Sequence, residues 1–201
     1  MKILAVADEP SDYLWGPGAR EGLRGVDLIL SCGDLDPHYL SYLVSFSSAP
    51  LLYVRGNHDQ RYEVTPPEGC ECIDGRLVVR GGLRILGLGG SIRYNRTGPP
   101  YQYSQAEMKR RAQKLWFALR QKGGFDILLT HSAAFGLGDG DDPAHVGFLV
   151  FRELLDRWAP PLFIHGHSHL NYSTKLKRLS YHGNTQIINA FGRYSFEIAG
   201  K

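Results

Sequence analysis

Hydrophobic residues in this sequence gather into five short, nearly unbroken runs, which predict strands buried on both faces. A strand with one face in water would alternate apolar and polar residues, and these runs do not alternate. Parallel strands covered on both sides by other layers of a fold show this pattern. The runs occupy residues 3–7, 26–32, 50–55, 125–130 and 161–165.

Segments with a helical spacing of apolar residues lie between several of these runs. Ser104 stands three residues before Glu107, as in a capping box, and glycines at 123–124 favour a helix end. Asp142 is expected to cap the start of the last segment, which prolines at 160–161 terminate. The predicted helices cover residues 37–46, 104–124 and 145–158.

Two other regions have the composition of hairpins. Residues 70–88 contain short apolar runs around a DG turn and an RGG turn. Residues 172–198 have a turn at HGN and predict a hairpin or a meander. Crossovers combined with hairpins predict an α/β protein with mixed sheets, and the length suits one domain over residues 1–201.

The composition, with 43% hydrophobic and 21% charged residues, is that of a soluble globular protein. The net charge of +3 suits an anionic substrate and is far from that of a dedicated nucleic-acid binder. The first apolar run is too short for a signal peptide, and no stretch approaches the roughly 20 apolar residues of a membrane span. The three cysteines lack zinc-site spacing. We therefore expect free thiols in a cytoplasmic protein with no membrane partner, and a homodimer on base rates alone.

Each of the five runs is followed by a residue type that binds metal ions. In open α/β sheets the carboxyl ends of the strands converge on one edge, where the loops carry the chemistry. These side chains are therefore expected to lie together. They are Asp8, Asp34, Asn57, His131, His167 and His169.

This set contains two carboxylates, one carboxamide and three imidazoles, and no thiolate. Any one of them alone is better explained as a turn former, a helix cap or a packed histidine. Their joint occurrence after successive strands favours a metal site. Six ligands are too many for one tetrahedral zinc ion and suit two divalent ions that share a bridging carboxylate.

The motifs GD at 33–34, GNHD at 56–59, His131 and GHSH at 166–169 follow successive strands in this order. In this arrangement the chain resembles the calcineurin-like metallophosphoesterases. The resemblance implies a four-layer α/β/β/α sandwich with two mixed β-sheets. It also implies a dinuclear metal centre that hydrolyses phosphate monoesters or diesters, with attack by a metal-bridging hydroxide and no covalent enzyme intermediate.

Carried over residue by residue, the resemblance implies two metal sites that share Asp34. The first ion has Asp8 and His169 as its other ligands. Mn²⁺ is the expected metal, with Fe, Zn or Ni as alternatives. The second ion draws on the remaining three residues, Asn57, His131 and His167.

The resemblance gives His58 and Asp59 catalytic roles rather than metal ligation. His58 is expected near the leaving-group oxygen as a general acid or oxyanion stabiliser, with Asp59 steering its ring through the other nitrogen. No structural role for either residue is evident from the sequence, which favours activity. His165 ends the strand before GHSH and is expected to be packed or hydrogen-bonded rather than a ligand.

The sequence departs from the family pattern in its first motif, which is usually Asp-x-His and here is Asp8, Glu9 and Pro10. Proline has no side-chain atom that binds a metal. The first ion therefore keeps three protein ligands and is expected to be held more weakly. Glu9 or Asp12 could substitute, although alternation along an extended chain would point Glu9 away from Asp8.

Two loops beside the motifs contain candidate contacts for a small phosphate-ester substrate. Residues 89–104 supply Arg93, Tyr94 and Arg96, which suit a phosphate and a base or sugar ring. The alternative for this stretch is a solvated Gly/Pro loop. Residues 136–148 are acidic, lack the final glutamate of an EF-hand, and contribute His145 as a candidate that faces the substrate.

The leading hypothesis is a metal-dependent phosphohydrolase that cleaves a phosphomonoester or phosphodiester. One alternative is a weakly active or inactive interaction scaffold of the same fold, which a large exposed apolar patch away from the metal edge would favour. Another is a nuclease, which would need an Arg/Lys groove leading to the centre. The mild net charge disfavours the nuclease.

Overall fold

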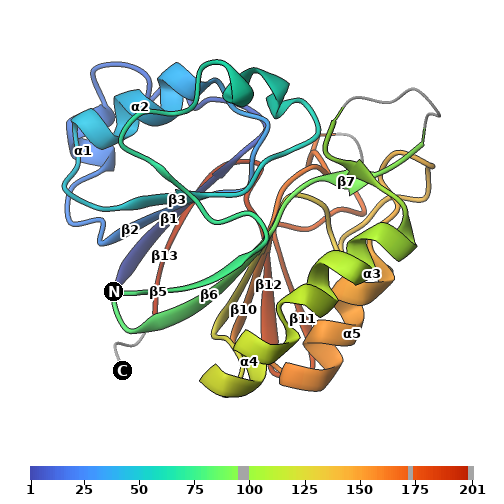
Figure 1. Ribbon diagram of the computed structural model, residues 1–201. Coiled ribbons are helices and arrows are strands. Elements are labelled where there is room, and N and C mark those ends of the chain that lie inside the picture. Colours follow the sequence, from blue (N-terminus) through green and yellow to red (C-terminus); the bar gives the residue numbers. More distant parts are fainter. Residues whose placement is uncertain (95–99, 172–173, 199–201) are drawn as a thin grey trace.

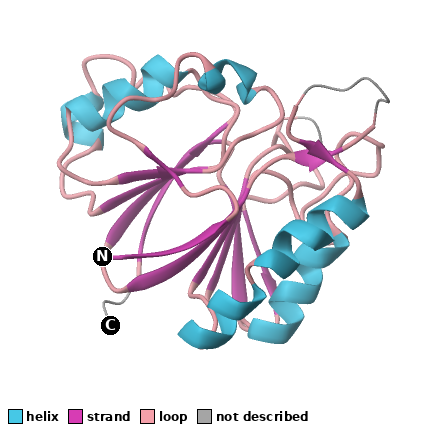
Figure 2. Ribbon diagram, viewed as in Figure 1, coloured by secondary structure: helices cyan, strands magenta, loops and turns pink. Residues whose placement is uncertain are grey.

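Two large β-sheets pack face to face, and helices cover the outer face of each (Figure 1). The computed structural model describes residues 1–94, 100–171 and 174–198. The order of layers is helix, sheet, sheet, helix, as the colouring by secondary structure also shows (Figure 2). The fold is therefore the four-layer α/β/β/α sandwich that the resemblance implies.

The first sheet has the strand order β13-β1-β2-β3-β4. β1 to β4 run parallel, and β13 is antiparallel to β1, so the sheet is mixed. On its connections lie α1 (Ala19–Gly22), α2 (Pro37–Ser45) and the 3-10 helix η1 (Asp59–Glu63). Its strands are β1 (Lys2–Ala7), β2 (Leu28–Ser31), β3 (Leu51–Tyr53), β4 (Glu71–Cys72) and β13 (Gly192–Glu197).

The second sheet has the strand order β11-β12-β10-β9-β6-β5. Its inner strands run parallel, and β5 and β11 are antiparallel to their neighbours. Helices α3 (Gln105–Lys114), α4 (Trp116–Lys122) and α5 (Leu149–Trp158) cover it, and β7 (Ser91–Ile92) pairs with β8 (Gln102–Tyr103) apart from it. Its strands are β5 (Arg76–Arg80), β6 (Leu83–Leu88), β9 (Ile127–Thr130), β10 (Leu162–His165), β11 (Leu179–His182) and β12 (Thr185–Asn189).

The hydrophobic runs are nearly continuous because each central strand faces a core on both sides. In β1, Ile3 lies in the core between the sheets, whereas Leu4 packs in the core beneath α2. In β10, Ile164 lies in the inter-sheet core and Phe163 in the core beneath α3 and α5. Successive side chains thus enter different apolar cores, which leaves no position for a polar residue.

The five runs form β1, β2, β3, β9 and β10, as predicted. The helix expected at 37–46 is α2, and the capping box of Ser104 and Glu107 is present at the start of α3. The segment 104–124 forms two helices rather than one, and Leu115 lies between them. Gly123 closes α4 in the left-handed conformation, with a φ of 68°.

The predicted start of the last helix is wrong. α5 begins at Leu149 rather than at residue 145, because Phe148 is held in an extended bridge beside Ala134 and donates its N–H to Ala133. Asp142 therefore does not cap the helix. Its carboxylate instead accepts the backbone N–H of Ala144 at 3.0 Å.

The hairpin predictions hold for two strand pairs and fail for two other strands. β5 pairs with β6 around RGG, and β11 pairs with β12 around HGN. β4 instead joins β3 in parallel, and β13 crosses to the first sheet to pair with β1. Both strands form sheet edges by pairing with strands distant in the sequence. Local turn signals do not indicate such long-range pairing.

The described residues contain no helix that is both long and apolar enough to cross a bilayer. The three cysteines are free thiols, as expected.

Candidate metal centre

The candidate ligands meet where the carboxyl ends of the two sheets come together. Asp8 and Asp34 follow β1 and β2 of the first sheet, and His131 follows β9 of the second. The peptide N–H of Gly166, just after β10, donates to the carbonyl of His131 at 2.9 Å, and that of Asp8 donates to Gly33 at 3.1 Å. Backbone hydrogen bonds thus fix the loops of each sheet at this edge.

One group of ligand atoms converges closely. The Nε2 atom of His131 lies 3.0 Å from the Oδ1 of Asn57 and 3.3 Å from the Oδ2 of Asp34. Atoms of Asp34, His131 and His167 that can bind a metal all lie within 4.8 Å of one another. Two ligands on one ion about 2.1 Å away are separated by about 3.0–3.4 Å. The residues predicted for the second ion therefore fit a divalent cation.

Backbone carbonyls orient both histidines of this group. His131 donates its Nδ1–H to the carbonyl of Cys32 at 2.9 Å, which directs Nε2 at Asp34 and Asn57. His167 donates its Nε2–H to the carbonyl of Ala144 at 2.9 Å, which leaves Nδ1 as its ligand atom. A metal-binding histidine is ordinarily held this way through its other ring nitrogen.

Asp34 and His131 form an ion pair in the metal-free protein. Burial opposes the charge on each, but at His131 the carboxylates of Asp34, Asp8 and Asp59 together outweigh burial and raise its pKa to about 9. Burial likewise opposes ionisation of Asp34, but His131 and the peptide N–H of His58 hold its pKa at about 2. A proton on His131 thus lies where a metal ion would bind, so metal binding releases that proton.

Three of the candidate ligands have a strained backbone. Asp8, Asp34 and His167 have φ values of 65°, 57° and 65°, in the left-handed region that residues with a side chain avoid. Such a conformation costs of order 1–3 kcal/mol per residue and concentrates at functional sites. The surrounding hydrogen bonds must therefore impose these turns.

The glycines of the motifs allow close approach between the loops. A Cβ on Gly56 would lie 2.1 Å from the Oδ1 of Asp34, and a Cβ on Gly166 would lie 2.8 Å from the Oδ2 of Asp8. Neither contact is tolerable, so Gly56 leaves room for the carboxylate that follows the neighbouring strand β2, and Gly166 for the carboxylate that follows β1 of the other sheet.

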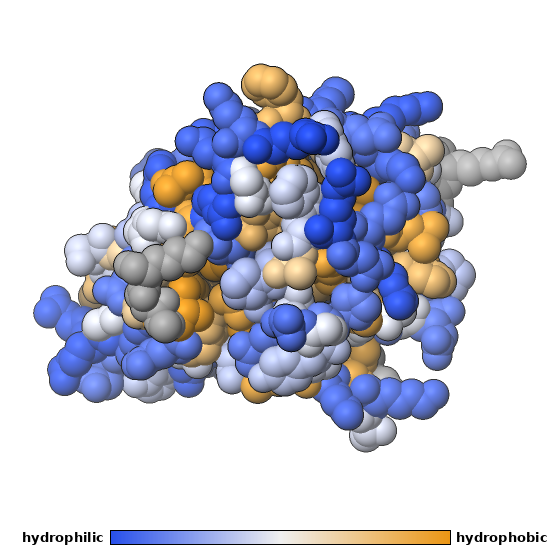
Figure 3. All heavy atoms as spheres, turned by 90° about the horizontal axis from the view of Figure 1, so that it is seen from below, coloured by the Kyte–Doolittle hydropathy of each residue, from blue (hydrophilic) through white to orange (hydrophobic). Residues whose placement is uncertain are grey.

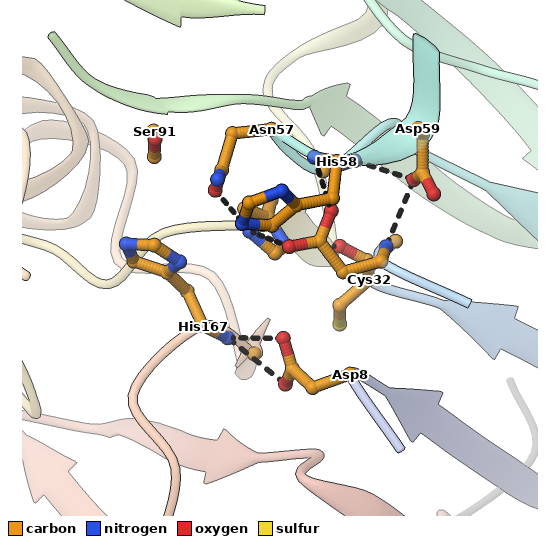
Figure 4. Close-up of polar contacts among 12 residues, drawn as sticks. Asp8, Cys32, Asn57, His58, Asp59, Ser91 and His167 are labelled. Carbon is orange, nitrogen blue, oxygen red and sulfur yellow. Dashed lines mark hydrogen bonds and ion pairs between the residues drawn. The ribbon is translucent and has the colours of Figure 1, made fainter. Parts of the chain in front are cut away.

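The residues expected at the first ion are near one another but less convergent. Both carboxylate oxygens of the buried Asp8 accept the peptide N–H of His167 at 3.0 Å (Figure 4). The Nε2 of His169 is 3.9 Å from the Oδ1 of Asp8. No second trio of Asp, Glu, Cys or His ligand atoms converges within 4.8 Å among the residues that the structure describes.

The premise of the expectation for Glu9, an extended chain at Asp8, is wrong. The chain is not extended at Asp8, because the N–H of Glu9 turns back to the carbonyl of Ala7 at 2.7 Å. Burial lowers the pKa of His169, and the charge of Glu9 acts on the same ring to raise it. Glu9 therefore supplies negative charge near His169, on the side that lacks the usual histidine.

Asp59 has a structural role that the sequence did not indicate. Its carboxylate accepts the backbone N–H groups of Gly56 at 2.7 Å and Asp34 at 2.8 Å, and so ties the GD and GNHD loops together (Figure 4). Burial, with Asp34 nearby, raises its pKa to about 6. No hydrogen bond from Asp59 to the His58 ring is present among the described residues, so the predicted steering of that ring is not seen.

His58 is exposed at the start of η1, next to the centre. Its backbone, with φ −105° and ψ 6°, is in the bridge region where many active-site residues lie. Its peptide N–H donates to the Oδ1 of Asp34 at 2.7 Å. His165, in contrast, is buried and donates its Nδ1–H to the carbonyl of Gly166 at 3.0 Å, which confirms its expected packed role.

The predicted substrate contacts are only partly near the centre. Arg93 is engaged elsewhere, since its guanidinium donates to Gln102 and pairs with Glu107 at 3.0 Å. Tyr94 is 40% exposed, and Arg96 lies outside the described residues. His145 does lie beside the centre, with its ring centroid 4.8 Å from that of His167.

Replacing Gly56 by alanine should displace Asp34 and lower the affinity for Mn²⁺ by about 10–100-fold, the loss typical for disturbed ligand support. Calorimetric titration with Mn²⁺ measures this. Gly183→Ala is the control, because a Cβ there meets no atom within 4 Å, and the strain of its φ of 56° falls in the turn between β11 and β12, at the sheet end opposite to the ligands. Equal affinities of the two variants would contradict the close-approach argument.

Asp8→Asn should stabilise the metal-free protein in a pH-dependent way. Burial raises the pKa of Asp8 from 3.8 to about 7, so stability present in acid is lost as the pH rises through 7. Asparagine stays neutral and still accepts the His167 N–H. In urea unfolding with EDTA, the variant's advantage should grow by about 2–3 kcal/mol between pH 5 and pH 8. A constant difference would mean that Asp8 does not titrate there.

Comparison with known proteins agrees with this geometry. The family model described as calcineurin-like phosphoesterase matches residues 13–171. TT1561 of Thermus thermophilus is similar in structure, with a TM-score of 0.60 and 17% identity over 94% of this chain and 88% of that one. No curated protein matches the sequence.

Two other solved structures are more distantly similar. The sulfate thiohydrolase SoxB of Thermus thermophilus has a TM-score of 0.46 and 16% identity, over 87% of this chain and 35% of that one. Vps29 of Chaetomium thermophilum has a TM-score of 0.41 and 14% identity, over 94% and 72%. The family match covers most of the sequence and includes the GD, GNHD, His131 and GHSH positions. The chain therefore belongs to the calcineurin-like phosphoesterase family.

Proposed function

We propose that the protein is a metal-dependent phosphoesterase with two divalent ions at the edge where the sheets meet. The observation that carries this proposal is the convergence of Asp34, His131 and His167 in a centre that backbone hydrogen bonds pre-form. Asn57 completes the second site, and Asp8 and His169 serve the first. Asp34 is the shared ligand.

When bound, divalent ions polarise a phosphoryl group and make water nucleophilic at neutral pH. The chain's residues then have three tasks. The two groups of ligand residues would hold the ions at the edge where the sheets meet. The His167 N–H fixes the carboxylate of Asp8. The exposed His58 ring gives a proton to the leaving oxygen. A monoester and water are thereby converted to phosphate and an alcohol, and a diester and water to a monoester and an alcohol.

Mn²⁺ is the proposed metal, because carboxylate, carboxamide and imidazole ligands suit it and the ligand set contains no thiolate. The first ion is the weaker one. Pro10 stands where the family has histidine, and Glu9 offers only a partial replacement as a nearby charge.

The experiment is hydrolysis of p-nitrophenyl phosphate, bis-p-nitrophenyl phosphate and glycerol 2-phosphate by protein stripped with EDTA and then given Mn²⁺. Turnover that needs Mn²⁺ supports the proposal, and the preferred ester separates monoesterase from diesterase activity. If the protein binds the ions but hydrolyses none of the three esters, the proposal is contradicted.

His58→Ala should lower turnover of glycerol 2-phosphate by about 10²–10⁴-fold and leave the metal content unchanged, because the ring protonates a poor leaving group and binds no ion. Turnover of p-nitrophenyl phosphate should fall much less, since p-nitrophenolate leaves without a proton. His182→Ala, at a partly exposed histidine of β11 that pairs with Asp156, is the control. Equal losses with both esters would contradict the general-acid role.

Partner binding is a second candidate function, which one feature favours. A groove of about 830 Å³ between α3 and α5 is lined in part by Trp116, Val150 and Leu154. On the face seen from below Figure 1, hydrophobic areas are small and separated by hydrophilic residues (Figure 3). The groove lining includes none of the candidate metal ligands, so partner binding would be compatible with hydrolysis.

A further inference from the structure

A polar cavity of about 530 Å³ lies next to the candidate metal centre. Two residues connect it to the centre. His145 lines the cavity, and its ring is packed against that of His167. Ser168, which stands between His167 and His169, also lines it. The volume is within the range of small-molecule sites.

One wall of the cavity is the loop after β9, which presents the carboxylates of Asp139, Asp141 and Asp142. A second wall is the segment before β11, which contributes the ammonium groups of Lys175 and Lys177. The lining thus combines hydrogen-bond acceptors with donors. Asp142 is paired with His145 at 2.8 Å and Asp139 accepts the N–H of Gly147 at 3.0 Å, so each keeps only part of its acceptor capacity for a ligand.

The hydroxyl of Ser168 points to a ligand independently of these charges. Ser168 is 1% exposed, and its Oγ has no hydrogen-bond partner among the described residues. A buried hydroxyl without a partner costs free energy that a bound polar group or water recovers. In the chain it stands between two of the candidate metal ligands, His167 and His169.

The lining selects one chemical class. A hydroxyl group both donates and accepts, so an alcohol with several hydroxyls bonds to both walls. An anionic group would meet the carboxylates, and a cationic group would meet the ammonium groups. Among the described residues, the lining includes one large apolar residue, Leu176, and no aromatic ring other than that of His145, so these residues offer no matching surface to a lipid chain or a nucleobase.

We infer that this cavity receives the alcohol part of the substrate, and that the substrate is a phosphoester of a neutral, hydroxyl-rich alcohol such as a sugar or polyol. The inference rests on the proposed function for its phosphoryl site, and it adds a specificity site formed by the loop at 136–145 and the segment at 175–180. The phosphoryl group lies at the metal edge while the hydroxyls bond to Asp141 and Lys177.

The test compares glucose 6-phosphate with phenyl phosphate, which has a ring of similar size and no hydroxyls. The variant Asp141→Ala/Lys177→Ala removes one residue from each wall at exposed positions. Lys122→Ala/Glu197→Ala, which removes the same charges outside the cavity, is the control. A second readout is saturation transfer from metal-free protein to the sugar protons of glucose 6-phosphate.

With Mn²⁺ bound, the cavity variant should raise KM for glucose 6-phosphate at least about tenfold, as for loss of a hydrogen bond to a charged group. It should leave kcat/KM for phenyl phosphate within about twofold, and the control should change neither. Saturation transfer should be seen with the wild type and the control and be lost in the cavity variant.

If phenyl phosphate is hydrolysed but the cavity variant keeps its KM for glucose 6-phosphate, the cavity inference is overturned and the proposed function stands. If neither ester is hydrolysed, and bis-p-nitrophenyl phosphate is not hydrolysed either, the proposed function fails and saturation transfer decides. If the sugar signal is lost only in the cavity variant, sugar binding in the cavity is supported. If the wild type gives no signal, or the cavity variant gives the same signal as the wild type, the cavity inference is overturned.

Discussion

The contact on which the site depends is the buried pair of Asp34 and His131, because it joins the loops of the two sheets. His131 follows a strand of the second sheet, yet both of its ring nitrogens are directed at the first, toward the carbonyl of Cys32 and the side chains of Asn57 and Asp34. A buried charge without its partner costs several kcal/mol, so neither sheet edge can move away without penalty. A bound ion would strengthen the same junction.

The surrounding loops are built to hold that junction in a strained form. Asp59 ties the GD and GNHD loops through two peptide N–H groups, and the His167 N–H holds Asp8. These bonds offset the left-handed conformations of Asp8 and Asp34, and the adjacent glycines provide the room. The strained backbone thus lowers the stability of the fold and arranges the candidate ligands in advance, as a metal site requires.

Much of the fold and of the ligand set could be predicted from the sequence, because buried parallel strands and metal-binding residue types leave strong local patterns. The contributions of the Cys32 and Ala144 carbonyls could not, since every residue has a carbonyl and only the tertiary structure directs it. The structural role of Asp59 could not be predicted for a similar reason, because its partners are backbone groups. The alternation of side chains along an extended strand did not apply to Glu9, because the chain turns at Asp8.

The most direct test of the account is anomalous diffraction from crystals grown with Mn²⁺. The account predicts one strong anomalous peak bound by Asp34, Asn57, His131 and His167, and a weaker peak beside Asp8 and His169. Data at a second wavelength identify the metal. Crystals in millimolar Mn²⁺ without a peak at this edge, and with the Asp34–His131 pair intact, would contradict the central claim.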